Sequence, residues 1–261
     1  MRLFDTHCHL TWDEEQQPAL PRLERAREAG VEKFICVSID LDNAKRCAEL
    51  ASEHADVYPS VGIHPNDVGA AADLDAKMSA LRDMAQDPQY VAIGETGLDF
   101  FRDWADPEVQ RASLEGHLQL AIERDLPVIL HCRDAMDGLL PILRAHAPEL
   151  RGIMHCYSAG PGTITELVEL GMHISFAGNL TYPKSQDLRD ACRLVPEERL
   201  LVETDAPFLA PQPRRGKKNE PAFVAFTLEA LAAEREVEAE ALAATTYANA
   251  CAVFGLAADG K

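Results

Sequence analysis

The residues of this chain that can do chemistry stand at the ends of apolar runs. The apolar start of the chain leads directly into His7, Cys8 and His9. In an extended chain alternate side chains leave on opposite faces, so His7 and His9 share one face and Cys8 faces the helices as a packing thiol. Two imidazoles side by side are suited to binding a zinc-like ion. Taken alone, this tripeptide is better explained by two histidines without a shared function. Whether they bind a metal therefore depends on whether other apolar runs also end in possible ligands.

Five later apolar runs end in polar groups of the same kind. Strand alternation predicts that Ile93 and Glu95 share one face, so that apolar side chains filling a core lead up to the acid. In the same way, Ile129 is expected to share a face with His131, and Leu201 with Glu203. One such histidine is as well explained by a half-buried, hydrogen-bonded ring, but matching positions at so many ends favour a common site. The polar residues concerned are His64, Glu95, His131, Arg133, His155, Glu203 and Asp205.

The number of these groups indicates two metal ions. One tetrahedral catalytic site takes three protein ligands and an open position, whereas two ions about 3.5–4 Å apart can share a bridging carboxylate. Glu95, between the histidine groups in strand order, is the expected bridge. Mixed imidazole and carboxylate ligands leave Mg²⁺, Mn²⁺ or Zn²⁺ open. We assign one ion to His7, His9, Glu95 and Asp205, and the other to Glu95, His131 and His155.

The elements that must position these residues alternate along the chain. After the opening strand, strands are predicted at 34–39, 57–62, 91–94, 128–130, 152–154, 173–176 and 200–203. Helices are predicted at 17–29, 42–54, 74–85, 107–124, 136–146, 164–170, 185–194, 222–234 and 238–253. Eight strand–helix units predict an α/β fold, a (β/α)₈ TIM barrel with a parallel eight-stranded sheet, an extra C-terminal helix and one domain spanning 1–261. An open doubly wound sheet is less favoured because the Gly-x-Gly-x-x-Gly motif is absent after the first strand.

In such a barrel the active site lies at the carboxyl ends of the strands, where the residues above fall. His54, His117 and His146 fall within predicted helices and are expected to be ordinary surface or helix residues. His173 begins a strand, so we expect it at the opposite, stabilising end of the barrel.

Composition narrows the class of protein. The formal charge of −18 excludes a protein that coats nucleic acid or membrane through a generally basic surface. Seven cysteines without Cys-x-x-Cys pairs indicate a reducing compartment. Without a signal-peptide pattern or an apolar run long enough for a membrane span, the expected location is cytoplasmic.

Several motifs together resemble the TatD-like deoxyribonucleases, within the amidohydrolase-type metal hydrolases. The resemblance runs from Asp5 to the final helices and implies a barrel, a two-metal centre with the ligands assigned above, and metal-dependent DNA hydrolysis, often 3′→5′ exonucleolytic. The motifs are Asp5-Thr6-His7-Cys8-His9, Gly62-Ile63-His64-Pro65, Gly94-Glu95-Thr96-Gly97-Leu98-Asp99, His131-Cys132-Arg133, His155-Cys156-Tyr157-Ser158, Glu203-Thr204-Asp205-Ala206-Pro207 and Asn219-Glu220-Pro221.

Phosphodiester cleavage gives roles to the acids and to His64. Besides bridging the ions through Glu95, the site can use Asp205 to orient or deprotonate the attacking water. Glu203 and Asp5 are candidates to hydrogen-bond a ligand imidazole, and for both a buried acid satisfied by backbone or water is the alternative. His64 is expected to contact phosphate; protonation of the leaving oxygen and orientation of a neighbour remain alternatives.

Substrate binding calls for local cations and aromatic rings. Arg133 is expected to contact a phosphate, unless it pairs with an acid such as Glu203. A cluster of cations in the loop after the eighth strand can hold a polyanion, or form only a solvated surface. Aromatic residues after the fourth strand can stack a terminal base, or pack the loop. These groups are Arg214, Arg215, Lys217 and Lys218, and Phe100, Phe101 and Trp104.

The expected enzyme is a monomeric metal-dependent deoxyribonuclease acting on single-stranded or frayed DNA ends. The same metal centre can hydrolyse small esters, amides or lactones, including aminoacyl esters, and this is the alternative activity. A metal-binding adaptor without catalysis is the remaining class, and it predicts that Glu95→Ala leaves function untouched.

Overall fold

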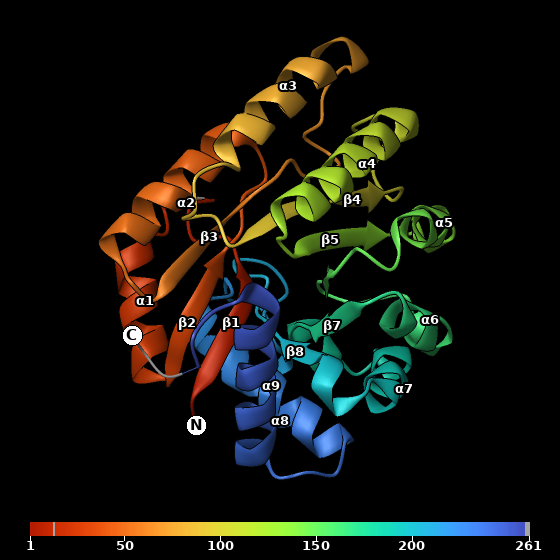
Figure 1. Ribbon diagram of the computed structural model, residues 1–261. Helices are drawn as coiled ribbons and strands as arrows, with labels where there is room; N and C mark the ends of the chain where they lie inside the picture. Colours follow the sequence, from red (N-terminus) through yellow and green to blue (C-terminus); the bar gives the residue numbers. More distant parts are fainter. Residues whose placement is uncertain (13, 259–261) are drawn as a thin grey trace.

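The computed structural model of the chain describes residues 1–12 and 14–258. In this part of the chain eight parallel strands alternate with helices in the order β1 to β8 (Figure 1). The strands are β1 (Leu3–Cys8), β2 (Val31–Cys36), β3 (Val57–Val61), β4 (Ala92–Asp99), β5 (Val128–Arg133), β6 (Gly152–Met154), β7 (Met172–Phe176) and β8 (Leu200–Val202). The helices are α1 (Ala19–Glu28), α2 (Leu41–Glu53), α3 (Ala71–Met84), α4 (Pro107–Arg124), α5 (Met136–His146), α6 (Ile164–Glu169), α7 (Gln186–Leu194), α8 (Val224–Glu234) and α9 (Ala239–Phe254).

The predicted (β/α)₈ barrel with an additional C-terminal helix is confirmed. Helices 107–124 and 136–146 and the strand 152–154 begin and end where the periodicity placed them. β4 and β5 extend further than predicted, because the polar residues at their ends stay paired as far as Asp99 and Arg133. Within the described residues no helix has the length and apolar character of a membrane span.

The barrel closes where β1 meets β8. Cys8 forms a parallel bridge with Ala206, and the His9 N–H donates to the Ala206 carbonyl at 2.7 Å. The Asp5 carboxylate accepts the Thr204 N–H at 2.9 Å and the Thr204 hydroxyl at 2.6 Å. These contacts bring the two ends of the sequence together, and Figure 1 shows the C-terminal helices α8 and α9 beside β1.

The barrel interior is a separate apolar cluster that supports the site from below. It contains one side chain from each of several strands, including Ile129 from β5 and Leu201 from β8, both followed two residues later by a polar group at the site. Residues of α9 extend this cluster, with the Tyr247 and Phe254 rings 5.9 and 6.0 Å from the Phe4 ring. The extra helix therefore packs against the end of the barrel opposite the polar residues.

Two register shifts decide which side chains reach the site. In β4 the pairing with β5 shifts between Ile93 and Thr96, and Ile93 packs with the helices while Ala92 fills the interior. The prediction that Ile93 and Glu95 share a face is therefore wrong, although Glu95 still faces the site. One extra residue in a strand reverses the alternation beyond it, and such bulges are frequent beside active sites.

The second shift lies in β1, between Asp5 and Cys8. Within this interval Thr6 is buried, with its hydroxyl 3.3 Å from the Ser175 hydroxyl of β7. After it, Cys8 packs among the helices, as expected. Of the two roles expected for Asp5, the structure has the alternative, a buried acid satisfied mainly by backbone N–H groups, and not a bond to a ligand imidazole. The register shift between Asp5 and Cys8 is the reason, because alternation was counted through it. Asp5 joins β1 to β8 instead, and burial raises its pKa to about 8.

Glycine is required on both sides of Glu95. Gly94 has φ +135° and Gly97 has φ +146°, values that other residues rarely adopt. A Cβ on Gly97 would lie 1.9 Å from the His131 carbonyl oxygen, and one on Gly94 would lie 2.6 Å from that of Ile129. The two glycines thus let β4 approach β5 closely while it presents Glu95.

His117 is fully buried in α4, which corrects the expectation of an ordinary surface or helix histidine. Its Nε2 accepts the Ile63 N–H at 3.0 Å, and its Nδ1–H donates to the Ser113 carbonyl at 2.7 Å. The imidazole therefore holds the segment that carries His64. Sequence periodicity placed His117 on a helix but could not show which face of α4 the barrel covers.

This burial predicts a pH dependence of stability. Burial lowers the pKa of His117 from 6.5 to about 4, so between these values the unfolded chain binds a proton that the folded chain does not. The contribution to the free energy of unfolding is therefore fully present above pH 6.5 and is lost as the pH falls, by roughly 3 kcal/mol. Urea unfolding of chelator-treated protein at pH 7 and 4.5 should show a smaller loss in His117→Gln than in wild type. His54→Gln, changed at a partly exposed histidine, should match wild type; equal losses in all three proteins would contradict the assignment.

Candidate metal centre

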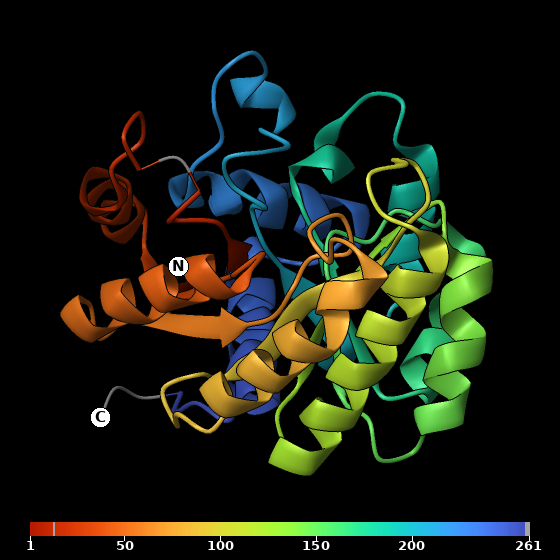
Figure 2. The ribbon, with the colours of Figure 1, turned by 90° about the horizontal axis from the view of Figure 1, so that it is seen from above.

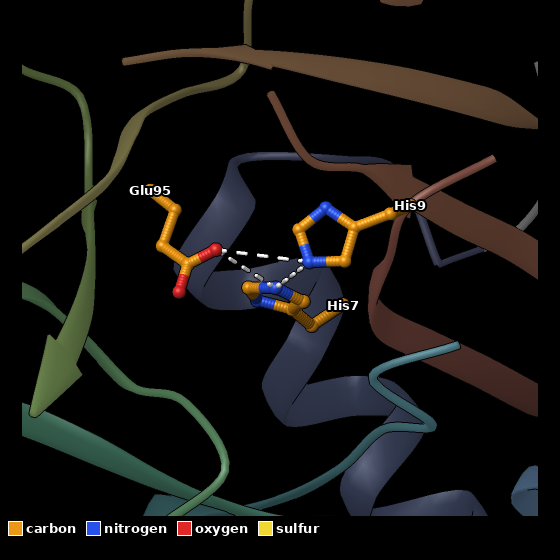
Figure 3. A group of neighbouring side chains, drawn as sticks. All are labelled: His7, His9 and Glu95. Atoms are coloured by element: carbon orange, nitrogen blue, oxygen red, sulfur yellow. Dashed lines mark hydrogen bonds and ion pairs between the residues drawn. The ribbon is translucent and has the colours of Figure 1, made fainter. Parts of the chain in front are cut away.

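The carboxyl end of β1 and the middle of β4 bring three predicted ligands together (Figure 3). The Nε2 atoms of His7 and His9 lie 3.2 Å apart, and Glu95 Oε2 lies 3.5 and 3.7 Å from them. Two imidazole nitrogens bound to one tetrahedral ion at about 2.0–2.1 Å lie about 3.3 Å apart. The spacing therefore suits two ligands of one ion, with a carboxylate oxygen on the same side.

The other carboxylate oxygen of Glu95 faces a second pair of imidazoles. Glu95 Oε1 lies 3.0 Å from His131 Nδ1 and 2.8 Å from His155 Nε2, and these two nitrogens are 3.4 Å apart. The His155 ring stacks on the His7 ring with centroids 3.9 Å apart, so the two groups adjoin. Each oxygen of Glu95 thus belongs to a different group of imidazoles.

Asp205 completes the first group from β8. Its Oδ1 lies 3.8 Å from His7 Nε2 and 3.5 Å from His9 Nε2. Its backbone has φ +56°, and its N–H donates to the His7 carbonyl at 2.9 Å, so barrel closure fixes its place. All six predicted ligands therefore surround one volume: His7, His9, Glu95, His131, His155 and Asp205.

The chemistry of these donors fits divalent cations. Burial raises the pKa of Glu95, but the imidazoles of His155 and His64 outweigh it and hold that pKa well below its usual range. Burial lowers the pKa of His155, but the acids Glu95 and Glu203 outweigh this effect and hold that pKa well above its usual range. A buried, anionic carboxylate lies here among imidazoles that attract a proton. Such a group of side chains also attracts a metal cation, which binds in place of that proton. The His7 Nδ1 atom, buried and without a partner among the described residues, gives the same indication of an incomplete polar site.

Glu203 holds His155 from below. Its Oε1 lies 3.2 Å from His155 Nδ1 and accepts the Cys156 N–H at 2.8 Å. This is the predicted contact between an acid and a ligand imidazole, and it fixes the ring with Nε2 toward Glu95. The second oxygen of Glu203 is buried with no partner among the described residues, and Glu203 forms a group of possible ligands with His7 and His155.

Asp99 has a role that sequence reasoning missed. Its Oδ2 lies 3.3 Å from His131 Nε2 and accepts the Asn66 amide at 2.9 Å, while Oδ1 accepts the N–H groups of Phe101 and Arg102. Burial raises its pKa, but the His131 imidazole outweighs this and lowers it below the usual range. Its place at the end of β4, four residues after Glu95, was the available signal.

His64 lies at the edge of the second group. Its Nε2 is 3.7 Å from Glu95 Oε1, and its ring meets the His131 ring edge-on at 4.6 Å. The Asn66 N–H donates to its Nδ1 at 3.1 Å, which leaves Nε2 to face the site. Burial lowers its pKa to about 4, so this imidazole is neutral at pH 7.

Of the predicted substrate-binding cations, Arg133 stands nearest the ligands in sequence, at the end of β5. Its guanidinium lies 3.7 Å above the Phe101 ring and makes no salt bridge with Glu203. Phe101 is 57% exposed and Trp104 65%, with the Arg102 guanidinium 4.2 Å above the latter. Phe100 is different: it is partly buried and packs against the core.

The four cations of the predicted cluster after β8 have different surroundings. Arg214, the last residue of the 3₁₀ turn η4 (Gln212–Arg214), lies over the rings of Phe223 and Phe226, at 5.4 and 5.0 Å. Arg215 lies 4.2 Å above the Tyr182 ring. Lys217 and Lys218 are exposed, and Lys218 Nζ lies 3.5 Å from Gln16 Oε1. Figure 2 shows this loop and the loop after β1 rising on the same side of the barrel.

A (β/α)₈ barrel whose strand ends present buried imidazoles around shared carboxylates defines a metal-dependent hydrolase. The family model described as "TatD related DNase" matches residues 4–255, and the chain belongs to this family. It is accordingly an enzyme that acts on ester bonds.

Individual relatives agree with this assignment. The chain is 34% identical to the "3'-5' ssDNA/RNA exonuclease TatD" of Klebsiella pneumoniae, covering 99% of this chain and 100% of the relative. It is 36% identical to the "Uncharacterized metal-dependent hydrolase YcfH" of Escherichia coli K12, covering 99% and 98%. The crystal structure of YJJV, a TatD homolog from Escherichia coli K12, matches with a TM-score of 0.91 at 32% identity, covering 98% and 99%.

Proposed function

We propose that this protein is a two-metal exonuclease that removes nucleotides from the 3′ end of single-stranded DNA. The proposal rests on the positions of the two carboxylate oxygens of Glu95. One oxygen lies toward His7 and His9, and the other lies toward His131 and His155. A relative that matches over its full length is named as a 3′-5′ ssDNA/RNA exonuclease. The protein is proposed to act as a monomer.

Two divalent cations held by these ligands would supply a water of lowered pKa and neutralise charge on the phosphate. The residues of the chain do the rest. Asp205 accepts the proton of the attacking water through the oxygen that does not face the imidazoles. Glu203 and Asp99 hold the rings of His155 and His131 in place. His64, neutral and facing the site, donates a hydrogen bond to a phosphoryl oxygen.

The acidic surface favours a short contact with the substrate over a long one. With a net charge of −18, the protein repels a duplex that lies across its face. Cations near the site act locally: Arg133 above Phe101 can contact one phosphate while the ring stacks a base. A single strand end needs only such contacts.

Hydrolysis of a 3′-labelled and a 5′-labelled single-stranded oligonucleotide tests the proposal. With Mg²⁺, Mn²⁺ or Zn²⁺ we expect stepwise shortening from the 3′ end, lost on chelation and recovered when metal is restored. Metal analysis of protein purified without chelator should approach two ions per chain. Products that start from internal positions would contradict exonucleolytic action, and absence of chelator-sensitive cleavage with every metal would contradict the nuclease assignment.

A further inference from the structure

Two exposed aromatic rings, which the mechanism does not use, stand beside the first metal-ligand group. Trp12 follows β1 and Phe208 follows β8; they are 47% and 41% exposed. Their ring centroids lie 5.5 Å apart in an edge-to-face contact. Although they touch, each keeps about half of its surface open to solvent. Large apolar rings on a surface mark a binding site when they adjoin a functional group.

Short backbone connections fix this pair relative to the ligands. The Trp12 N–H donates to the His9 carbonyl at 3.4 Å, and the Phe208 N–H donates to the Asp205 carbonyl at 2.8 Å. The His9 ring centroid lies 6.2 Å from the Trp12 ring and 6.0 Å from the Phe208 ring. Each ring is therefore positioned by the turn that follows a predicted metal ligand.

A buried amide holds the second of these turns. The Asn219 side chain donates to the Phe208 carbonyl at 2.6 Å and to the Thr204 carbonyl at 2.8 Å, and it is 1% exposed. These bonds fix the chain on both sides of Asp205. The aromatic pair is therefore pre-organised, which lowers the entropy lost when a ligand binds.

The position of the pair suggests what it binds. β1 and β8 adjoin each other, and β4 and β5 lie across the barrel mouth from them. Phe101 with Arg133 therefore flanks the ligands on one side, and Trp12 with Phe208 flanks them on the other. A phosphodiester at the centre carries a nucleoside on each side. A flat ring of any base can stack on an exposed aromatic face.

Resting on the proposed function, we propose that Trp12 and Phe208 form a nucleobase-binding subsite that holds one of the two nucleosides flanking the scissile phosphate. The subsite acts by stacking and therefore accepts any of the bases. It contributes to binding and to positioning of the strand, whereas proton transfer stays with the acids.

Substrates that lack one base test the subsite. Trp12→Leu and Phe208→Leu should each raise KM for a single-stranded oligonucleotide about 10-fold, with a smaller change in kcat. Trp12→Phe, which keeps an aromatic face, should recover most of the loss. The same measurements are made with an abasic tetrahydrofuran residue at the terminal position and, in a second oligonucleotide, at the penultimate position. For one of these two substrates, Trp12→Leu should no longer raise KM, because the base that the ring stacks is already missing. Leu194→Ala, an exposed apolar residue at the end of α7, is the matched control and should behave as wild type.

A binding measurement separates this proposal from the nuclease assignment. The chain has two tryptophans, so Trp104→Phe leaves Trp12 as the sole tryptophan, which can be excited selectively at wavelengths that tyrosine does not absorb. A deoxynucleoside monophosphate should quench Trp12 fluorescence, and deoxyribose 5-phosphate should not. Equal losses on intact and abasic substrates, or equal responses to both ligands, would overturn the subsite. A response that depends on protein concentration alone would instead assign the pair to self-association and also overturn it. Failure of cleavage by wild type with quenching intact would overturn only the nuclease assignment.

Discussion

Replacing Glu95 by glutamine is expected to lower kcat/KM for a single-stranded oligonucleotide by about 10³-fold or more, because the charge that would be shared by both metal ions is lost. The amide keeps the shape of the side chain, so the barrel should fold. Its neutral group cannot bridge two cations, and its NH₂ would face imidazole nitrogens that now contact Oε1 or Oε2. The loss of activity should therefore be accompanied by a loss of bound metal.

The measurement pairs initial rates with metal analysis of the same samples. Metal content in Glu95→Gln should fall from two ions per chain to one or none, and circular dichroism should match wild type. Glu115→Gln, at an exposed position on α4, is the matched control and should keep both activity and metal. A Glu95→Gln protein with wild-type activity would show that hydrolysis does not need the Glu95 charge, and one with full metal content would exclude bridging.

Replacing Asp205 by asparagine is expected to lower kcat by about 10²–10⁴-fold, the range for loss of a positioned general base. Burial raises the pKa of this carboxyl, but the hydrogen bond from His9 and the charge of His7 outweigh it and lower the pKa below its usual value. The group is therefore an anion at neutral pH. Asparagine keeps an oxygen that can face His7 and His9 but cannot accept a proton.

A titration with metal separates the two roles of Asp205. If the residue transfers a proton, kcat of Asp205→Asn stays low when its metal sites are saturated. Complete recovery with excess metal would show that Asp205 is a ligand only. Asp187→Asn, at an exposed position on α7, should be indistinguishable from wild type and controls for the change of charge.

Sequence periodicity predicted the barrel because each strand is buried on both faces and each helix on one. The run before His131 is an example: Ile129 fills the interior, Leu130 packs with the helices, and His131 faces the site two residues later. The order of elements then placed the polar residues at one end of the barrel, since parallel strands present their carboxyl ends together. The choice of six ligands needed only this rule and the chemistry of imidazole and carboxylate.

The alternation of side chains along a strand predicted the wrong face where the strand contains a register shift. Glu95 faces the site although Ile93 faces the helices, because the register shifts between them. Asp5 joins β1 to β8 for the corresponding reason. A bulge adds one residue to a strand only when the neighbouring strand accepts the displaced backbone, as β5 does beside Gly94 and Gly97 of β4. That condition depends on the partner strand and is not visible in the run itself.

By itself, then, the sequence determined the order of strands and helices, the face of the barrel that carries chemistry, and which imidazoles and carboxylates belong to it. Only the tertiary structure decided which partner each of these groups contacts: the division of the Glu95 oxygens, the support of His155 by Glu203 and of His131 by Asp99, and the pairing of Trp12 with Phe208. The physical reason is the distance along the chain between the residues that make each contact. Periodicity reports burial of one element, whereas these contacts join strand ends far apart in the chain and exist only after β8 closes on β1.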